Sequence, residues 1–365
     1  MNTKLQHQIA LTLIPKVGDI QAKKLIAYCG GVEAIFKESF SNLQKIPQIG
    51  NSIIKSIKSA DVMKRAEEEM LFIEKHEIKP LFFLDEDYPQ RLKHCDDGPI
   101  LLYYKGNVDL NTAQILSIVG TRQASDHGQE ICSEIISQFA GSNTLIVSGL
   151  AYGIDSCSHK YALSNGLNTI GVLGHGLDRI YPAENRKYAE KMVNQGGLLT
   201  EFTKGTIPDR QNFPMRNRIV AGISDATLVV ESKARGGSLI TAFLAIDYNR
   251  DVFAIPGRPH DENSAGCNML IKKNVAHLIN NAKDIKELMN WESNNEENKA
   301  PQKQLFVELS ELEEKVIEKM SSETISVDQL SIITDLPMSK TTSILLSLEF
   351  KGVVKSFPGK QYKLI

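Results

Sequence analysis

The sequence predicts an α/β protein built around a doubly wound parallel sheet, with a helical region before the sheet and a smaller module after it. Two observations carry this prediction. Short apolar runs alternate with helix-length amphipathic stretches between about residues 81 and 290, and the patterns on either side of that region differ from it. The chain has 365 residues, which is enough for two or three domains.

Residues 1–80 are predicted to form a helical domain. The segments Leu13 to Ile26 and Leu43 to Ile57 each contain an apolar residue, a proline, two further residues, a glycine and then an amphipathic stretch. This order is typical of a helix–hairpin–helix unit, in which Gly18 and Gly50 would allow tight turns. A helical bundle that uses the same pattern only as a turn is the alternative.

Residues 81–290 are predicted to form the sheet domain, of an extended Rossmann-like kind. Helical stretches of 10 to 20 residues separate the apolar runs, and this spacing indicates parallel βαβ units. The expected strands are LLYYKG (101–106), ILSIV (115–119), TLIV (144–147), TIGVL (169–173), LLTEF (198–202), ATLVVES (226–232), DVFAIPG (251–257) and AHLIN (276–280).

The polar run 291–304 is predicted to be a linker, because it contains Pro301 and shows no apolar period. Residues 305–365 show three helical patterns and a final extended pair, the order of a winged-helix domain. Residues 302–365 hold eight lysines, nine acidic residues and no arginine. We therefore expect this module to contact protein rather than to read duplex DNA.

Charge is informative by position. The net charge is −2, yet nine of the eleven arginines fall between Arg122 and Arg258. Because guanidinium groups suit phosphate recognition, an anion site is expected in the middle of the chain, with ordinary surface ion pairs as the alternative. The five cysteines form no CxxC pair, and no apolar run is long enough to span a membrane, so a cytoplasmic protein with reduced thiols is expected.

Loops after the expected strands carry small, hydroxyl and guanidinium side chains where ligands bind in such sheets. They include Gly120-Thr121-Arg122, the run from Ser148 to Asp155, the Arg216-Asn217-Arg218 segment and the Gly236-Gly237-Ser238 helix start. At least three strand ends are thus suited to anions, which favours a polyphosphate or a nucleic-acid backbone. Base-stacking candidates are Tyr152, Tyr181 and Phe213.

A catalytic interpretation is weaker. The sequence has no GxSxG, HExxH, Walker or complete dinucleotide motif, and no metal-ligand spacing. His159 follows Asp155 by four residues, so the two side chains are expected to share a helix face and hold each other in place. Neither an enzyme nor a cofactor is predicted.

The ordered motifs of the sheet region resemble the DNA processing protein A (DprA/Smf) family. The resemblance rests on YPQRLKHCDDGPILLYYKG, SIVGTRQASDHG, SGLAYGIDSCSHKYAL, GVLGHGLDRIYPAEN, FPMRNRIVAGISDATLVVES and GGSLITA. It implies a cytoplasmic protein that binds single-stranded DNA without turnover, protects it, and helps load the RecA recombinase in natural transformation. It also implies a homodimer formed through the sheet domain, a sterile-alpha-motif-like (SAM-like) N-terminal domain and a winged-helix C-terminal domain.

Carried over motif by motif, the resemblance assigns DNA contact to two groups of residues. The first-ranked residues are Arg122, Ser148, Gly149, Arg216, Arg218, Gly237 and Ser238, and the second-ranked residues are Lys160, Arg179 and Tyr181. Asn217, between the two arginines of the RNR segment, is also expected to contact DNA. Charge reversal at Arg122 or Arg216 is then expected to weaken single-strand binding for all sequences while the fold persists.

Two departures from the family pattern are present: ARGGSLIT where many relatives have SGSLIT, and NMLIKKNVAHLI where a Gly-Ala pair is usual. Two other functions stay open. One is a nucleotide-processing enzyme of the lysine-decarboxylase-like phosphoribohydrolase type, although its PGGxGTxxE motif is missing. The other is a regulator that reads duplex DNA through the winged helix.

Overall fold

The computed structural model describes residues 3–59, 61–291, 309–320, 324–351, 353–357 and 361–364. The chain divides into two compact units, residues 1–292 and 293–365, which are described separately. The predicted division at residue 80 stays a prediction, because the N-terminal helices and the sheet belong to one compact unit. The predicted linker lies outside the described residues, apart from Trp291.

Six helices precede the sheet, as the sequence predicts: α1 (Thr3–Thr12), α2 (Asp19–Cys29), α3 (Val32–Lys37), α4 (Phe40–Leu43), α5 (Asn51–Ser59) and α6 (Met63–Lys75). Their core includes Ile9, Leu25 and Ile54, and it continues onto Leu101 and Tyr103 of the sheet.

The two punctuated segments share one backbone feature. Lys16 and Gln48, each two residues before the glycine of its segment, have φ of 69° and 65°. Gly18 itself has φ −90°, so the left-handed residue of this turn is not the glycine. Gly18 therefore uses no backbone conformation reserved for glycine, and the helix–hairpin–helix interpretation stays a prediction.

The sheet has nine strands: β1 (Lys79–Phe82), β2 (Leu101–Gly106), β3 (Ile115–Val119), β4 (Leu145–Ser148), β5 (Thr169–Val172), β6 (Gly196–Thr200), β7 (Ala226–Val229), β8 (Asp251–Ala254) and β9 (His277–Leu278). Their order is β1-β2-β6-β5-β4-β3-β7-β8-β9. Strands β3 to β9 are parallel and confirm the doubly wound prediction. The first two strands differ from it, because β1 pairs antiparallel with β2 and β2 antiparallel with β6.

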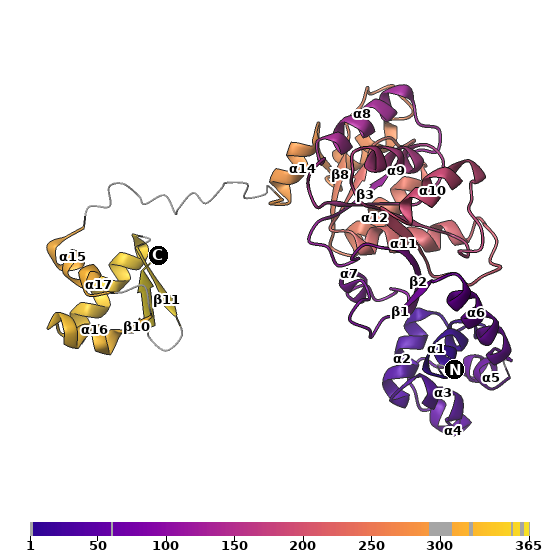
Figure 1. The fold of residues 1–365 in the computed structure, drawn as a ribbon, viewed down its shortest axis with the longest axis horizontal. Coiled ribbons are helices and arrows are strands. Elements are labelled where there is room, and N and C mark those ends of the chain that lie inside the picture. The colour runs from indigo at the N-terminus through magenta and orange to yellow at the C-terminus, as the bar shows by residue number, and fades with distance from the viewer. Residues whose placement is uncertain are drawn as a thin grey trace. The chain divides into compact units, whose positions relative to one another are not determined.

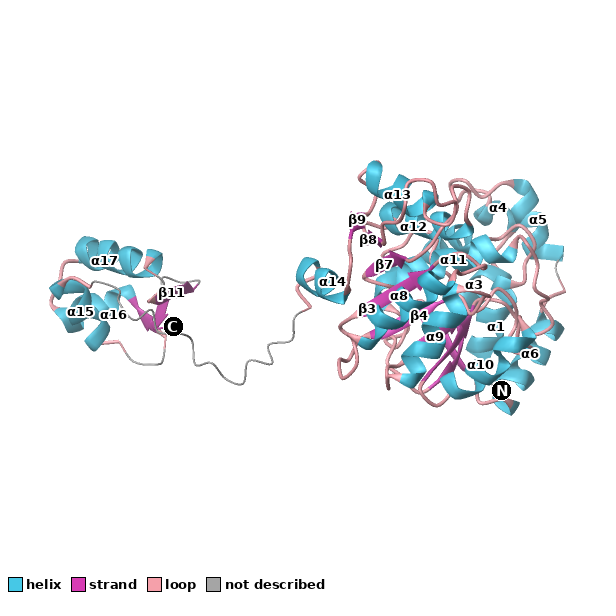
Figure 2. Cartoon of the chain, turned by 90° about the horizontal axis from the view of Figure 1, so that it is seen from above, coloured by secondary structure: helices cyan, strands magenta, loops and turns pink. Residues whose placement is uncertain are grey.

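Helices cover both faces of the sheet (Figures 1 and 2). In β3, Ile115 and Val119 belong to one core, while Leu116 and Ile118 belong to the core on the opposite face, as the two-residue period of a strand requires. The first face packs against α11 (Asn212–Ile223), α12 (Gly237–Asp247) and α13 (Ala265–Lys272), and the second against α8 (Asp126–Ser137), α9 (Ile154–Ser164) and α14 (Ala282–Leu288). The short helices α7 (Gln90–Lys93), η1 (Ala183–Asn185) and α10 (Arg186–Met192) complete the unit.

The strand order reverses at β3. The chain runs outward from β3 through β4, β5 and β6 in one direction, and through β7, β8 and β9 in the other. In open parallel sheets the loops that leave such a reversal diverge, and a crevice opens at the carboxyl ends of the strands. The loops after β3 and β7 are therefore where a ligand site is expected.

Residues 309–320, 324–351, 353–357 and 361–364 form the described part of the second unit. It contains α15 (Glu311–Glu318), β10 (Ile325–Ser326), α16 (Val327–Thr334), α17 (Met338–Phe350), β11 (Val354–Phe357) and β12 (Gln361–Leu364). Val316, Leu330, Leu345 and Leu348 form its core. Its sheet has the order β10-β12-β11, so the winged-helix prediction is confirmed, with β10 as a short third strand.

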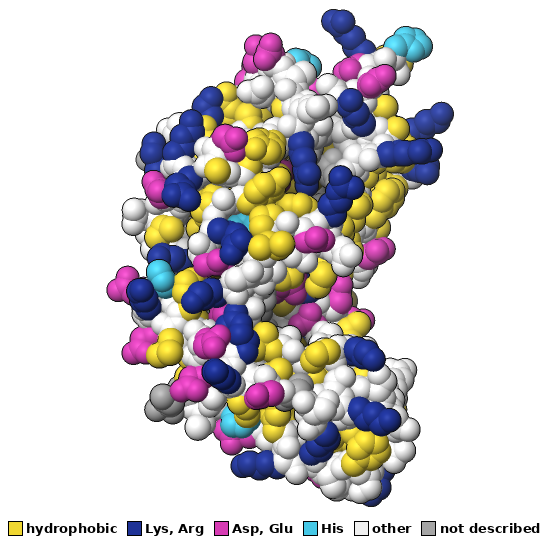
Figure 3. Space-filling model, turned by 90° about the vertical axis from the view of Figure 1, so that its right-hand side faces the viewer, with side chains coloured by type: hydrophobic (Ala, Val, Ile, Leu, Met, Phe, Trp, Pro, Cys, Tyr) yellow, Lys and Arg dark blue, Asp and Glu magenta, His cyan; other side chains and the backbone are white. Residues whose placement is uncertain are grey.

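Charged side chains are spread over the surface. On the face drawn in Figure 3, Lys and Arg side chains lie in several places with Asp and Glu side chains between them. Within the part of the chain that the structure describes, every helix is too short or too polar to cross a membrane.

Candidate nucleic-acid interface

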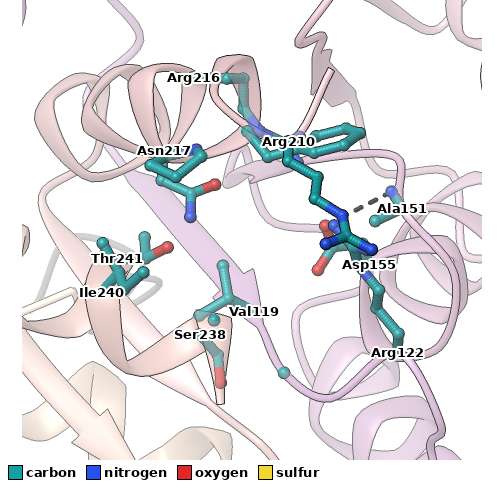
Figure 4. A pocket seen from close by; sticks show the side chains of 14 residues that line it. Val119, Arg122, Ala151, Asp155, Arg210, Arg216, Asn217, Ser238, Ile240 and Thr241 are labelled. Atoms are coloured by element: carbon teal, nitrogen blue, oxygen red, sulfur yellow. Dashed lines mark hydrogen bonds between the residues drawn. The ribbon is translucent and has the colours of Figure 1, made fainter. Parts of the chain in front are cut away.

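A cavity of about 480 Å³ occupies the crevice at the strand-order reversal. Its wall comes from the end of β3, the loop before α9, the first turns of α11 and the start of α12 (Figure 4). The lining residues are Val119, Gly120, Arg122, Ala151, Asp155, Arg210, Phe213, Pro214, Arg216, Asn217, Gly237, Ser238, Ile240 and Thr241.

Arg122 is shared by this cavity and two neighbouring ones. One neighbour is lined by Tyr152, Tyr181 and Phe213, and the other, of about 650 Å³, by Tyr152 and Lys160. We call these three cavities together the Arg122 groove. All three have the exposed Arg122 among their lining residues, so one guanidinium group borders each of them.

Aromatic rings accompany the cation in the groove. The guanidinium carbon of Arg122 lies 5.0 Å from the centroid of the Phe213 ring, and that ring lies 6.2 Å from the ring of Tyr181. Tyr181 is 47% exposed and Tyr152 is 42% exposed, and the hydroxyl of Tyr152 donates to Glu184 at 2.9 Å. Both tyrosine side chains are therefore partly exposed beside Arg122, and their predicted role in base stacking stays a prediction.

Arg216 lies beneath the groove as a buried cation. Its Nη1 donates to the carbonyl oxygen of Val172 at 2.6 Å. A Cβ on Gly149 would stand 1.9 Å from the same Nη1, so only glycine leaves room for this guanidinium group. Gly149 therefore leaves room for Arg216, and it also lines the cavity that contains Tyr181 and Phe213, so its predicted phosphate contact stays a prediction.

Asp155 is the acidic partner of this buried charge. Burial raises the pKa of Asp155 and lowers the pKa of Arg216, and in each case the opposite charge of the other group counteracts part of the shift. Arg122 acts electrostatically on both groups. In Figure 4 the side chains of Arg122 and Arg210 extend toward the part of the cavity where Asp155 lies.

The hydroxyl groups of the two predicted serines hydrogen-bond to other atoms of the protein. Ser148 is fully buried, and its hydroxyl donates to the carbonyl oxygen of Ile118 at 2.6 Å. Ser238 lines the cavity, but its hydroxyl donates to Oγ of Ser232 at 2.9 Å. The expectation that Ser148 reaches a ligand is therefore wrong, because its buried side chain hydrogen-bonds from β4 to β3 instead.

Gly237 begins α12 and lies open to the cavity. A Cβ placed on it would meet no atom within 4 Å. The first N–H groups of a helix have no carbonyl partner in the helix, and together with the helix dipole they attract anions. Asn217 also lines the cavity, and its predicted contact with DNA stays a prediction.

Arg218 is absent from the groove lining and lies in a different place. It forms ion pairs with Asp19, at 3.0 Å, and with Glu201, and it donates to the carbonyl oxygen of Asp97 at 2.5 Å. Its side chain is 10% exposed. Arg218 therefore joins α2 to the sheet region, and the prediction that it contacts DNA is corrected.

Of the second-ranked residues, Lys160 lines the groove and Arg179 does not. Lys160 is exposed and lines the groove, with its ammonium 4.8 Å from the ring centroid of Tyr161. Arg179 lines none of the three cavities and pairs with Asp178 at 2.8 Å.

The histidines near the groove are structural. Nδ1 of His159 hydrogen-bonds Oγ1 of Thr169 at 2.7 Å, so the expected pairing with Asp155 does not form. Burial lowers the pKa of His159 to about 3 and also lowers the pKa of His175. Among the described residues, no group of three or more His, Cys, Asp or Glu side chains is arranged to hold a metal ion.

Two lining residues of the cavity were not predicted from the sequence: Arg210, and Asp155 as the acidic partner of Arg216. Arg210 is exposed at the mouth of the cavity, six residues before Arg216. Its signal was its place in the arginine-rich centre of the chain, directly before α11. Asp155 carried no such signal, because its role depends on a buried arginine from another element.

Comparison with known proteins gives consistent matches. The family model for DNA recombination-mediator protein A matches residues 79–290, and the model for the DprA winged helix domain matches residues 300–360. Protein Smf of Synechocystis sp. is 30% identical over 397 aligned positions, covering 99% of each chain. DNA processing protein DprA of Streptococcus pneumoniae is 43% identical over 202 residues, or 55% of this chain and 71% of that protein.

Two solved structures extend the comparison. The X-ray structure of DprA from Streptococcus pneumoniae superposes with a TM-score of 0.67 at 33% identity, covering 77% of this chain and 97% of that one. DNA processing protein A from Helicobacter pylori, whose structure was described for its single-stranded DNA binding mode, gives a TM-score of 0.54 at 29% identity, with 59% and 96% covered. The chain therefore belongs to the DNA recombination-mediator protein A family, whose members are named DprA or Smf.

Proposed function

We propose that this recombination mediator binds single-stranded DNA along the Arg122 groove. The observation that carries the proposal is the exposed guanidinium of Arg122, which borders three cavities beside the rings of Phe213, Tyr181 and Tyr152. The single-stranded DNA binding described for the Helicobacter pylori relative supports it.

The chemistry of the groove suits an unpaired strand. Arg122, Arg210 and the start of α12 offer positive charge to successive phosphates, and the aromatic rings offer faces on which bases stack. Stacking contributes about 1–3 kcal/mol per base and tolerates any sequence. We therefore expect binding that depends little on sequence and falls steeply as salt concentration rises.

Fluorescence anisotropy with labelled oligo-dT tests the groove. Arg122→Glu removes a cation and adds an anion, so we expect binding to weaken about tenfold or more, to a similar degree for other sequences. Gly237→Asp has room for its side chain and places a carboxylate at the anion-attracting end of α12, so binding also weakens.

Lys283→Glu on α14 is the matched control, because Lys283 is 73% exposed and lines none of the three cavities. We expect this variant to bind as the unaltered protein does. If Arg122→Glu retains full affinity at the same salt concentration, the proposed site is wrong.

The remaining properties of the family are also proposed for this chain. We propose that it protects incoming single-stranded DNA in the cytoplasm, forms a homodimer through the sheet domain, and helps RecA recombinase assemble on DNA during natural transformation. Membership of the family supports this proposal. RecA assembly on an oligonucleotide, with and without the protein, tests the loading step, and sedimentation of the full chain tests the dimer.

We propose that the chain acts without catalytic turnover. The buried, hydrogen-bonded His159 and His175 support this, because neither is poised to exchange a proton in the groove near neutral pH. Release of free base from nucleoside monophosphates by the purified protein would instead favour the phosphoribohydrolase alternative.

We propose that the winged-helix unit contacts protein. Ile332 is 80% exposed and Ile333 is 51% exposed near the end of α16, and Met338 is 44% exposed at the start of α17. Exposed apolar side chains grouped in this way are typical of protein contacts rather than of phosphate contacts.

A further inference from the structure

Two buried cysteines face each other between α8 and α9. Cys132 on α8 and Cys157 on α9 belong to the same core, and each thiol shifts the pKa of the other. Sγ of Cys157 also lies 4.0 Å from the carbonyl oxygen of Gln129, one turn before Cys132 on α8. Cys157 therefore packs against the helical turn that carries Cys132.

We propose that Cys132 and Cys157 form a peroxide-sensitive thiol pair, and that their oxidation to a disulfide weakens DNA binding in the adjoining Arg122 groove. The pairing is independent of the proposed function, whereas the effect on DNA rests on it.

Cys157 is the thiol positioned to react first. It lines the cavity that also contains Arg122 and Lys160, so a small hydroperoxide can reach it from the groove. The Cys132 thiol lowers the pKa of Cys157 against the opposing effect of burial, and the nearby Lys160 ammonium adds to the lowering. The thiolate is the form of cysteine that attacks peroxides.

The other cysteines lack this combination. Burial raises the pKa of Cys29, Cys95 and Cys267. Cys29 is half-buried and thus more accessible than Cys157, yet it has no thiol partner among the described contacts. If exposure alone decided which thiol is oxidised first, Cys29 would react before Cys157. Oxidation of Cys157 first would therefore show that its surroundings activate it.

The reaction balances with a hydroperoxide as the oxidant. The Cys157 thiolate attacks one peroxide oxygen, the O–O bond breaks, and the departing oxygen takes up the proton that Cys157 released. With hydrogen peroxide this gives a sulfenic acid on Cys157 and one water. The sulfur of Cys132 then attacks Sγ of Cys157, the S–O bond breaks, and hydroxide leaves as a second water with the proton of Cys132.

The bond would disturb the groove because the two helices support its central loop. A disulfide needs its sulfur atoms about 2.05 Å apart, closer than two unbonded sulfur atoms can approach, so its formation draws α8 and α9 together. The loop that carries Arg122 leads into α8 and is also held by α9, since Ile154 N–H donates to the carbonyl oxygen of Thr121 at 3.1 Å. A Cβ on Gly153 would stand 2.1 Å from the same oxygen, so the backbone before α9 approaches the Arg122 loop closely at this point.

The test uses the full chain, hydrogen peroxide and two readouts. Mass spectrometry of the digested protein reports a cross-linked peptide pair containing Cys132 and Cys157, and oligo-dT anisotropy reports affinity. We expect peroxide to produce the cross-link and to weaken oligo-dT binding about tenfold, the effect of losing one charge-assisted contact, and dithiothreitol to reverse both changes.

Cys157→Ala and Cys132→Ala should keep their affinity after peroxide treatment, and the control Cys29→Ser should behave as the unaltered protein does. Absence of the cross-link, or oxidation of Cys29 ahead of Cys157, overturns the thiol pair. A cross-link without loss of affinity overturns its coupling to the groove. If the reduced protein fails to bind oligo-dT, the proposed function fails instead, and the cross-link still decides the pairing.

Discussion

Arg216 and Arg218 lie two positions apart on α11 and have different surroundings. Residues two apart on a helix differ by about 200° in direction, so their side chains leave opposite sides. Arg216 lies under the groove, and Arg218 pairs with Asp19 and Glu201. The family motif places both arginines in one segment, but helical geometry alone excludes a shared contact.

The burial of Arg216 changes what its replacement should do. Arg216→Ala removes the hydrogen bond to Val172 and leaves the buried Asp155 without its main counter-charge. We expect the free energy of unfolding to fall by about 3 kcal/mol, as when one partner of a buried charged pair is removed. Urea unfolding measures this loss.

The exposed Arg122 provides the contrast, since Arg122→Ala should change the free energy of unfolding by less than about 0.5 kcal/mol. Equal urea midpoints for the two variants would contradict a structural role for Arg216. The expectation from sequence, that reversing the charge of Arg216 leaves the fold intact, is replaced by this one.

Arg122 and Gly237 line the groove because the segments that carry them leave the carboxyl ends of β3 and β7, where the sequence already predicts a ligand site. Asn217 also lines the groove, but from within α11. Ser148 and Gly149 belong to a similar loop, but their role depends on side chains from other elements that fill the space around them. A motif specifies residue type and order, and it does not specify burial.

At the scale of elements, α2 and α11 meet through more acidic than basic groups. Arg218 faces the carboxylates of Asp19 and Glu201, with Asp97 nearby, and Lys23 donates to the carbonyl oxygens of Cys95 and Asp96. Burial raises the pKa of Glu201 to about 7 and also raises the pKa of Asp19, although Arg218 opposes both shifts. The fold therefore retains protons that the unfolded chain releases.

The raised pKa values of Glu201 and Asp19 predict a free energy of unfolding that decreases as pH rises. An acid whose pKa is higher in the folded state stabilises the fold below its unfolded pKa, and that contribution is lost as pH rises through the folded value. For Glu201 the loss between pH 6 and pH 8 should be about 1 kcal/mol. Urea unfolding at pH 6, 7 and 8 measures it.

Glu201→Gln isolates the contribution, because its amide does not titrate. This comparison is needed because His159 has the opposite effect on the pH dependence. Its pKa is lowered to about 3 in the fold, so its contribution to the free energy of unfolding decreases as pH falls below the ordinary pKa of histidine. We expect the stability of the variant relative to the unaltered protein to rise from pH 6 to pH 8. A constant difference between the two proteins would show that Glu201 does not titrate in this range.

Most strands were predictable because their apolar runs are short and separated by helical periods. Strand β1 was missed, although it begins at Lys79 and lies at the edge of the sheet. Its four residues include Pro80, which lowers strand propensity and is tolerated at an edge, where one side of the strand needs no partner. The antiparallel pairing of β1 and β2 depends on contacts that local sequence does not encode.

For the whole molecule, a net charge of −2 gives no general attraction to DNA. On the face drawn in Figure 3 the charged groups are mixed in sign, and we expect the affinity to depend on the cations and rings of the Arg122 groove. Local charge of this kind still releases counterions from the strand, but only as many as the phosphates that the groove contacts.

We expect the first compact unit, residues 1–292, to bind single-stranded DNA without the second. Residues 1–292 contain the complete Arg122 groove and their own hydrophobic cores, and the described part of residues 293–365 has a separate core. A chain that ends at residue 292 should therefore fold, as circular dichroism and a cooperative urea transition would show. It should keep oligo-dT affinity within about threefold of the full chain, since a difference of this size corresponds to less than 1 kcal/mol. If the shortened chain folds but loses its affinity for oligo-dT, while the full chain prefers duplex DNA, the winged helix is the DNA-reading unit and the groove is not.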